Sequence, residues 1–326
     1  MKYNFITIGG ATEDITIYTS EGVLIDNKKD LTKQKLLGFE FGAKIEVEKS
    51  FSSFGGAASN TAVNFSRFGF KTATYIYIGD DERGKKILEN FKNQNVDISL
   101  IKKIKKINTG FSFVLVGPGN EHILFSERAA NSMLEIKRSD LVKLKNTKWI
   151  YIGSLSGIWQ DTLKKVFSLS KVKFAWNPGG AQLKAGASTL KKYIKNTNIF
   201  CVNKDEAIEL VMSDSKYKNK YKRFFNNSRN LQKVIKSWGA EIVVVTRGKN
   251  GADVYDGECF YHQNIMKEKK RVDTTGVGDA FNSSFVAGLE LYHGDIKKAM
   301  RLGLKNTASL ITKHGAQNGL LDKDDI

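Results

Sequence analysis

The chain has 326 residues, of which 41% are hydrophobic, and a formal net charge of +18 at pH 7. It is long enough to bury a substantial core, and no run approaches the roughly 20 apolar residues of a membrane span, which excludes membrane-spanning helices. Cys201 and Cys259 are too few for a disulfide framework or a zinc cluster, and the four histidines are scattered. The first apolar run is too short for a signal-peptide core, so we expect a cytoplasmic protein without a membrane partner.

The excess of lysine allows two interpretations. Lysine-rich surfaces attract nucleic-acid phosphates, and residues 216–225 ("KYKNKYKRFF") interleave basic and aromatic residues. However, only nine residues are arginine, which specific phosphate and base recognition favours, and the lysines are spread along the whole chain. We therefore interpret 216–225 as a solvated helix face or insert anchored by its Tyr and Phe residues, and expect no nucleic-acid partner. A basic nucleic-acid-binding protein without turnover is the alternative from a different class.

Strand-like and helical segments alternate along the chain. Strand-like runs lie at about 3–9, 72–78, 148–152, 172–176, 198–202 and 241–246, and helical segments at about 278–292 and 294–313 close the sequence. Helical patterns lie between most of the strands. This alternation predicts an α/β fold with a mostly parallel sheet that is covered on both faces.

Two pairs of segments depart from this alternation. Residues 14–18 with 44–48, and 110–116 with 121–126, alternate polar and apolar residues as half-buried antiparallel strands do, and "GPGN" joins the second pair. We expect them to form a small lid sheet, with lid strands from about 12–50 and 108–127 inserted in a single domain that spans 1–326. An exposed lid edge favours a homodimer through the lid, with a monomer as the alternative.

A glycine cluster opens the first long helical segment. In "SFGGAASNTAVNFSRFG", residues 53–69, Gly55 and Gly56 allow close backbone approach, and Asn60 follows one turn into the helix. An asparagine can donate and accept hydrogen bonds, which suits a polyhydroxylated ligand. Tight packing of small residues between helix and sheet is the alternative explanation.

A stretch at 79–86, "GDDERGKK", nearly matches the P-loop pattern G-x-x-x-x-G-K-[ST]. Its last position is Lys86 instead of Ser or Thr, and its acidic residues would repel phosphates. We interpret it as a helix start and not as a nucleotide site.

A second glycine segment places an acid at the start of an apolar helix. In "VDTTGVGDAFNSSFVAGLE", residues 272–290, the run Gly276-Val277-Gly278 comes directly before Asp279. Converging backbone N–H groups and the helix N-terminus make a cradle for an anion such as phosphate. An aspartate there could accept a proton from an attacking hydroxyl, although it is also an ordinary favourable helix start.

Taken together, these segments resemble the ribokinase-like (PfkB) family of sugar and nucleoside kinases. The resemblance rests on "GGAASNTAVNFSRFG" and "DTTGVGDAF" and extends over nearly the whole chain. Between them, "VNKDEA" at 202–207 is similar to the family's N-x-x-E element, and "VTRGKNGADVY" at 245–255 to its T-x-G-x-x-G strand and turn. The resemblance implies an α/β fold with a ribokinase-like, Rossmann-type core of three layers, a mostly parallel sheet and a small β-sheet lid.

The resemblance also implies a role for each matched position. Asp279 corresponds to the catalytic base, and the backbone of Gly276, Val277, Gly278 and Asp279 to the anion hole, with Val277 where the family usually has alanine. The implied acceptor-binding residues are Asp14, Gly55, Gly56, Asn60, Asn131 and Asn177. The implied nucleotide-binding residues are Asn203, Glu206, Thr246, Gly248, Gly251 and Asn306.

Two ions complete the implied site. Glu206 would organise Mg²⁺ through water, and Asp273, Thr275 and Gly315 are in register for a monovalent cation such as K⁺. Four of the implied roles have ordinary structural alternatives. Asp14 could start a lid strand, Glu206 could be a helix-surface charge, and Asn131 and Asn177 could be turn residues.

We therefore expect an ATP-dependent phosphotransferase that uses Mg²⁺ and phosphorylates a primary hydroxyl of a small sugar. A nucleoside kinase of the same family is the alternative, because Phe111, Phe113 and Phe125 on the lid strands could stack on a base, although they could equally form the lid's own core or a dimer contact. A sugar phosphate is the third option, and the abundance of lysine prevents the assignment of one basic residue to it.

Overall fold

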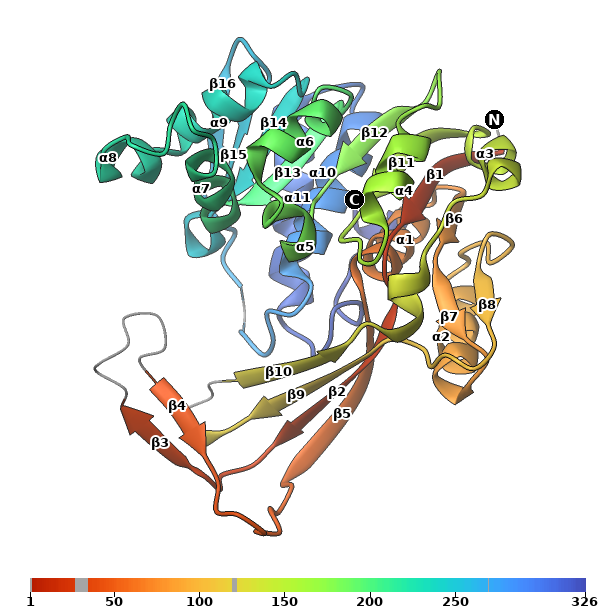
Figure 1. Cartoon of the computed structure of the whole chain (residues 1–326), viewed down its shortest axis with the longest axis vertical. Coiled ribbons are helices and arrows are strands. Elements are labelled where there is room, and N and C mark those ends of the chain that lie inside the picture. The colour runs from red at the N-terminus through yellow and green to blue at the C-terminus, as the bar shows by residue number, and fades with distance from the viewer. Residues whose placement is uncertain (1, 27–34, 119–121, 269) are drawn as a thin grey trace.

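A large sheet lies at the centre of the protein (Figure 1). The computed structural model describes residues 2–26, 35–118, 122–268 and 270–326. The sheet has eight strands in the order β16-β15-β14-β13-β12-β11-β1-β6. Their bounds are β1 (Tyr3–Ile8), β6 (Thr72–Tyr75), β11 (Thr147–Ile152), β12 (Lys173–Trp176), β13 (Ile199–Asn203), β14 (Ile242–Thr246), β15 (Ala252–Tyr255) and β16 (Phe260–Gln263). Neighbouring strands from β6 to β14 run parallel, and β15 and β16 are antiparallel.

Helices cover both faces of this sheet because successive residues of each buried strand point to opposite sides. In β1, Ile6 and Ile8 belong to one buried cluster, whereas Phe5 belongs to another. The first face carries α3 (Arg138–Leu144), α4 (Trp159–Val166), α5 (Gly180–Leu183), α6 (Gly186–Ile194), α7 (Lys204–Met212) and α9 (Ser228–Ser237). The opposite face carries α1 (Ala57–Arg67), α10 (Val277–Leu291) and α11 (Ile296–Leu310). The expected α/β core with a mostly parallel, doubly covered sheet is therefore confirmed.

The stretch that resembles a P-loop starts a helix, as predicted. Asp81 is the N-cap of α2 (Glu82–Asn93), and its Oδ1 accepts a hydrogen bond of 2.8 Å from the Gly84 N–H. The strand predicted at 72–78 is divided at Ile76, because β7 (Tyr77–Gly79) leaves the main sheet and pairs with β8 (Lys102–Ile104).

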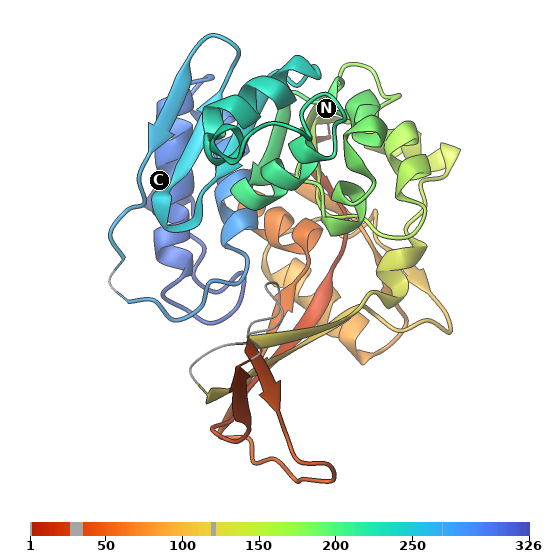
Figure 2. The same ribbon diagram turned by 60° about the vertical axis from the view of Figure 1, so that its left-hand side comes forward.

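A second sheet projects from one end of the core and forms the predicted lid (Figures 1 and 2). Its order is β10-β9-β2-β5, with β2 (Thr12–Tyr18), β5 (Lys49–Gly55), β9 (Phe111–Val116) and β10 (His122–Glu127). The prediction that 44–48 pairs with 14–18 is wrong. All seven residues of β2 pair with 49–55, from Thr12 opposite Gly55 to Tyr18 opposite Lys49, so 44–48 lies beyond the end of the strand. A separate hairpin, β3 (Val23–Asp26) and β4 (Lys35–Gly38), lies near that end of the lid (Figure 1).

The basic stretch 216–225 is attached to the core through its aromatic residues. It leads into α8 (Lys222–Asn226), where Phe225 is buried and Phe224 stacks on Tyr217 with ring centroids 6.0 Å apart. Its lysines are exposed. This confirms the interpretation as an insert anchored by Tyr and Phe. Among the residues that the structure describes, no helix combines the length and the apolar character needed to cross a bilayer.

Candidate active site

The acid of the second glycine segment occupies the first turn of α10. Gly276 is the N-cap residue, with φ of 76°, a left-handed conformation that side chains rarely adopt. A Cβ at Gly276 would lie 2.5 Å from the Ala316 Cβ, so only glycine fits this turn. A Cβ at Gly278 would meet nothing within 4 Å, which leaves open space in front of the helix start. The N–H groups of a first helical turn have no partner within the helix, so this surface can accept an anion.

Asp279 is held by α1, which packs beside α10 on the same face of the sheet. The Asn60 side chain donates from Nδ2 to the Asp279 Oδ2 at 2.9 Å, which joins the two glycine segments in one site as the sequence suggested. Burial raises the pKa of Asp279 above its ordinary value, and the Asn60 hydrogen bond opposes that rise. A half-buried carboxylate with a raised pKa and a neutral donor is suited to accept a proton.

A chain of amides continues from Asn60 to Gln317 and Asn90. The Gln317 Nε2 donates to the Asn60 Oδ1 at 3.1 Å, and the Asn90 Nδ2 donates to the Gln317 Oε1 at 2.9 Å. An ionised Asp279 can only accept, so Asn60 presents its NH₂ group to the acid and its oxygen to the Gln317 Nε2. Sequence analysis missed Gln317, which lies 257 residues from Asn60 and belongs to neither glycine segment.

Asp14 enters the site from the lid strand β2. Its Oδ1 accepts a hydrogen bond of 2.8 Å from the Thr12 hydroxyl. Burial raises the pKa of Asp14, while hydrogen bonds from Thr12 and Ser112 oppose the rise. A Cβ at Gly55 would stand 1.9 Å from the Asp14 Oδ2, and one at Gly56, where φ is 91°, 2.4 Å from the Gly10 carbonyl oxygen. The two glycines therefore let β5 and α1 pass close to this carboxylate.

A cavity of about 690 Å³ lies between the lid and the loop that leads into α10. Alternate residues of the lid strands line it: Asp14, Thr16 and Tyr18 from β2, and Ser112, Val114 and Val116 from β9. On the core side the lining includes 270–275, so the cavity reaches the residue before Gly276. His314 also lines it and stacks on Phe51, with ring centroids 4.0 Å apart.

The lid phenylalanines lie on the opposite side of the lid sheet. In β9, Phe111 and Phe113 alternate with the lining residues, and the Arg83 guanidinium lies 4.3 Å from the Phe111 ring centroid. Phe125 is paired in register with Phe113 and packs on it, with ring centroids 6.0 Å apart. The hypothesis that these rings stack on a base is therefore wrong, because a strand turns successive residues to opposite faces. The aromatic residues of the cavity are Tyr18 and His314.

Asn203 and Glu206 form a reciprocal cap at the start of α7. The Asn203 N–H donates to Glu206 Oε2, and the Glu206 N–H donates to Asn203 Oδ1, both at 2.8 Å. Burial raises the pKa of Glu206, the bond from Asn203 opposes this, and nearby carboxylates, Asp279 among them, raise it further. Oxygen ligands with uncompensated negative charge fit Mg²⁺. The role of Glu206 in organising Mg²⁺ through water stays a prediction.

The turn after β14 contains the other predicted nucleotide residues. Thr246 ends the strand, and Gly248 begins the short helix η3 (Gly248–Asn250) with φ of 54° and open space where a Cβ would stand. Gly251 is required by packing, because a Cβ there would lie 1.9 Å from the Gln263 carbonyl oxygen, and its nucleotide contact stays a prediction. The open position at Gly248 leaves room for a ligand against the backbone.

The three residues predicted to hold a monovalent cation do lie together. The Asp273 Oδ1 accepts from the Thr275 N–H and hydroxyl at 2.8 and 2.7 Å, and its Oδ2 accepts from the Gly315 N–H at 2.8 Å. Burial alone would raise the pKa of Asp273, but these hydrogen bonds lower it. The carboxylate thus joins the loops before α10 and after α11, and the cation site stays a prediction.

Two predicted ligand-binding asparagines bond to the protein itself. Asn306 is fully buried in α11, where its Nδ2 donates to Asn64 Oδ1 at 2.8 Å and its Oδ1 accepts from the Leu321 N–H at 2.8 Å. The prediction that it contacts the nucleotide is therefore corrected to a structural role. Asn131, in η2 (Ala129–Met133), bonds both the N–H and the carbonyl of Ala11 at 3.0 Å, which supports the alternative that it fixes a turn.

Asn177 contacts helix α10 and strand β13. Its Nδ2 donates to the Cys201 carbonyl at 2.9 Å, and its Oδ1 receives a longer contact of 3.4 Å from the Asn282 Nδ2. Asn282 lies three residues after Asp279 in α10. The structure thus places Asn177 beside the second turn of that helix, and its role toward the acceptor stays a prediction.

The sequence matches a known protein family over most of its length. Residues 27–323 match the model of the pfkB family of carbohydrate kinases. A protein of Archaeoglobus fulgidus described as an uncharacterized sugar kinase is 31% identical over 268 residues, 79% of this chain and 98% of its own length.

Two solved structures share the fold. The ribokinase of Arabidopsis thaliana, complexed with ribose and ATP, superposes with a TM-score of 0.81 at 18% identity and covers 99% of this chain and 97% of its own. The nucleoside kinase of Methanocaldococcus jannaschii superposes with a TM-score of 0.77 at 20% identity, with the same coverage of both chains. Together with the match over 27–323, these similarities show that the chain belongs to the pfkB family of carbohydrate kinases.

Proposed function

We propose that the protein transfers the γ-phosphoryl group of ATP to a primary hydroxyl of a small sugar. The observation that carries this proposal is the half-buried Asp279, with its raised pKa, in the first turn of α10 beside Gly276 and Gly278. In one position, the site offers a proton acceptor and a set of backbone N–H groups that can bind an anion.

The proposed reaction divides the work between these groups. Asp279 accepts the proton of the acceptor hydroxyl, whose oxygen forms a bond to the γ-phosphorus while the bond to the β,γ-bridging oxygen breaks and ADP leaves. The backbone N–H groups of 276–279 stabilise the negative charge on the transferring group. Thr246 and Gly248 lie at the turn that we assign to the nucleotide phosphates. Mg²⁺, organised through water by Glu206, would neutralise phosphate charge.

The lid cavity is the proposed acceptor site. Its volume of about 690 Å³ suits a small molecule, and Asp14 offers two oxygens that can accept bonds from adjacent hydroxyls. The sugar kinase of A. fulgidus and the ribokinase fold support a sugar as first choice. Tyr18 and His314 favour a nucleoside as second candidate, because their rings line the cavity and could stack on a base.

A sugar phosphate is the third candidate. Lys49, Lys270 and Arg271 line the same cavity and could pair with a phosphate on the acceptor. These three residues are therefore the candidates for a contact with the phosphate of such an acceptor.

The test is ADP release from Mg-ATP with ribose, fructose, other hexoses, fructose 6-phosphate and purine and pyrimidine nucleosides, with Asp279→Asn measured alongside. We expect acceptor-dependent turnover that falls by several orders of magnitude in the variant while ATP binding remains. Near-normal turnover of Asp279→Asn would refute the assigned base. Binding of nucleic acid with a steep salt dependence, without turnover on any acceptor, would favour the alternative class.

A further inference from the structure

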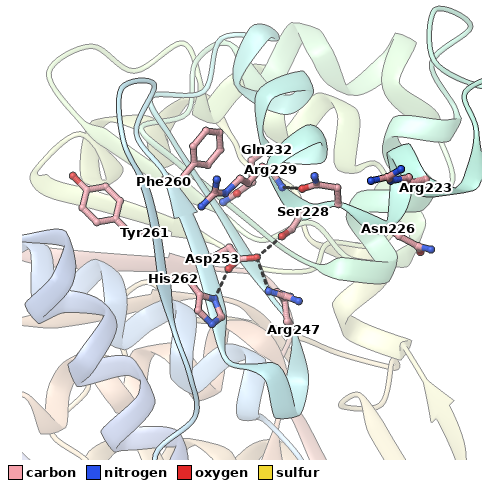
Figure 3. A pocket seen from close by; sticks show the side chains of 11 residues that line it. Arg223, Asn226, Ser228, Arg229, Gln232, Arg247, Asp253, Phe260, Tyr261 and His262 are labelled. Carbon is pink, nitrogen blue, oxygen red and sulfur yellow. Dashed lines mark hydrogen bonds and ion pairs between the residues drawn. The ribbon is translucent and has the colours of Figure 1, made fainter.

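A second cavity, of about 640 Å³, lies between α9 and the strands β14–β16 (Figure 3). It is distinct from the lid cavity, with which it shares no lining residue. Helix α9 packs on the face of the main sheet opposite α10, which carries Asp279. This second cavity is therefore not part of the proposed acceptor site.

Its lining is strongly basic. Three of the nine arginines of the chain, Arg223, Arg229 and Arg247, line it together with His262. The one acid of the lining, Asp253, is buried and already bonded: Arg247 donates to its Oδ2 at 3.3 Å, His262 Nδ1 lies 2.6 Å from its Oδ1, and the Ser228 hydroxyl also donates to it (Figure 3).

Two of the arginines have no acidic partner. Within 2–26, 35–118, 122–268 and 270–326, neither Arg223 nor Arg229 forms an ion pair. The Arg229 guanidinium lies 5.2 Å from the Phe260 ring centroid, a contact that leaves its N–H groups available. The cavity thus has an excess of positive charge that protein carboxylates do not balance.

The cavity also holds buried polar atoms without a partner. Gln232 is fully buried and lines the cavity, yet its Oε1 accepts no hydrogen bond from the described part of the chain. The Nε of Arg247 is likewise buried and donates to no described residue. Such atoms are rare in folded proteins, because burial without a hydrogen bond is unfavourable. One acceptor and one donor of hydrogen bonds therefore remain open beside the unbalanced arginines.

We propose that this second cavity binds a small organic phosphate. The phosphoryl oxygens would accept from Arg223 and Arg229 and from the Nε of Arg247, since a guanidinium matches phosphate geometry with paired N–H groups. A hydroxyl or amino group of the same ligand would donate to Gln232 Oε1. A volume of about 640 Å³ lies within the range of ordinary small-molecule sites.

The second cavity would bind a ligand and would not take part in the proposed phosphoryl transfer. Asp253 is buried and already bonded to Ser228, Arg247 and His262, so protein groups occupy its carboxylate. Arg247 lies in the chain between Thr246 and Gly248, so the second cavity and the proposed nucleotide site share one turn. Phosphate binding must therefore be measured with the nucleotide site already filled.

The experiment is calorimetric titration of the full-length protein, saturated with Mg-ADP, with inorganic phosphate, ribose 5-phosphate and AMP. The Asp14→Asn variant is titrated in parallel to remove binding at the lid cavity. We expect saturable binding of at least one organic phosphate in both proteins, and at least tenfold weaker binding in Arg223→Ala/Arg229→Ala. The matched control, Lys218→Ala/Lys222→Ala, removes two exposed lysines of the basic stretch 216–225 that do not line the cavity, and it should bind as the wild type does.

Each other outcome overturns the proposal. Equal weakening in the arginine and lysine variants would show general attraction to a basic surface, and absence of binding by all probes would show that no organic phosphate site exists. Binding of free phosphate alone would show a site for an inorganic ion only. Arg223→Lys/Arg229→Lys keeps the charge and should restore part of the affinity, and thermal unfolding confirms that each variant is folded. The readout is binding and not turnover, so its failure is separate from a failure of the proposed kinase reaction.

Discussion

Replacement of Asn60 by aspartate tests whether Asp279 acts as a base. The change is nearly isosteric, but it removes the donor 2.9 Å from the Asp279 Oδ2 and puts a carboxylate oxygen in its place. The Gln317 Nε2 still bonds the other oxygen of residue 60, so the new side chain is held where it repels Asp279. Two carboxylates that share such a site retain a proton between them.

The magnitude follows from the geometry. Two charges with centres about 4 Å apart interact by about 1 kcal/mol in water and about 4 kcal/mol at an effective dielectric constant of 20. At about 1.4 kcal/mol for each pKa unit, the pair should titrate about one to three pH units higher than Asp279 alone. A base works only when ionised, so its activity is present above its pKa and lost as the pH falls through it. We therefore expect the acid limb of kcat/KM to move to higher pH by about that amount.

The assay is kcat/KM between pH 5 and 9 with the best acceptor from the substrate panel, and the decisive result is recovery of the rate at high pH. Asn60→Leu removes the hydrogen bond without adding a charge, so its limb should move less. Asn318→Asp adds the same charge at an exposed position nearby and should leave the limb in place. If Asn60→Asp slowed the reaction equally at every pH, with the limb unmoved, Asp279 would not be the titrating base.

Four further changes probe other parts of the site. Asp279→Asn should raise Tm at pH 7 in a thermal scan, because the raised pKa of Asp279 means that its ionised form destabilises the fold. The expected rise is about 2 °C for each kcal/mol of destabilisation removed, and a lower Tm would contradict the effect of burial. Gly55→Ala should raise the acceptor KM at least tenfold, because its Cβ would displace the Asp14 carboxylate, while the KM for ATP stays unchanged. Asn306→Leu should lower the free energy of unfolding in urea by about 2–3 kcal/mol through lost buried hydrogen bonds, and an altered KM for ATP would restore a nucleotide role. Glu206→Gln should raise the Mg²⁺ concentration needed for half-maximal rate several-fold, and an unchanged Mg²⁺ titration would leave it as a cap alone.

Local sequence patterns predicted the parts of the site that are local in the chain. The glycine turn and Asp279 lie within a few residues of each other, so helix-start rules were sufficient to place the acid in the first turn of α10. The same holds for Asp81 as the cap of α2. These features depend on backbone conformation at one or two positions, which the residue type restricts directly.

Features that depend on which distant segments meet were not predictable in this way. Alternation suggested a strand at 44–48, but alternation does not set register, and β2 pairs with 49–55 instead. Asn306 matched a position near the nucleotide, yet its partner Asn64 lies 242 residues away on the buried side of α1. The sequence did not predict that Phe113 lies on the face of the lid away from the cavity. The face depends on the register between β9 and β2, because a shift of one residue would turn Phe113 to the other side.

The acids of the site are held by two different sets of hydrogen bonds, and their pKa values shift in opposite directions. Asp273 accepts three hydrogen bonds from neighbouring loops, which lower its pKa and make it a structural anion. Asp14 and Asp279 are held by neutral donors that do not offset burial, so their pKa values stay raised. A cation beside Asp279 would remove its basicity, whereas the Asn60 amide orients it and leaves it able to take a proton. Gln317 supports this arrangement, because its Nε2 donates to the Asn60 Oδ1 and holds the amide in place.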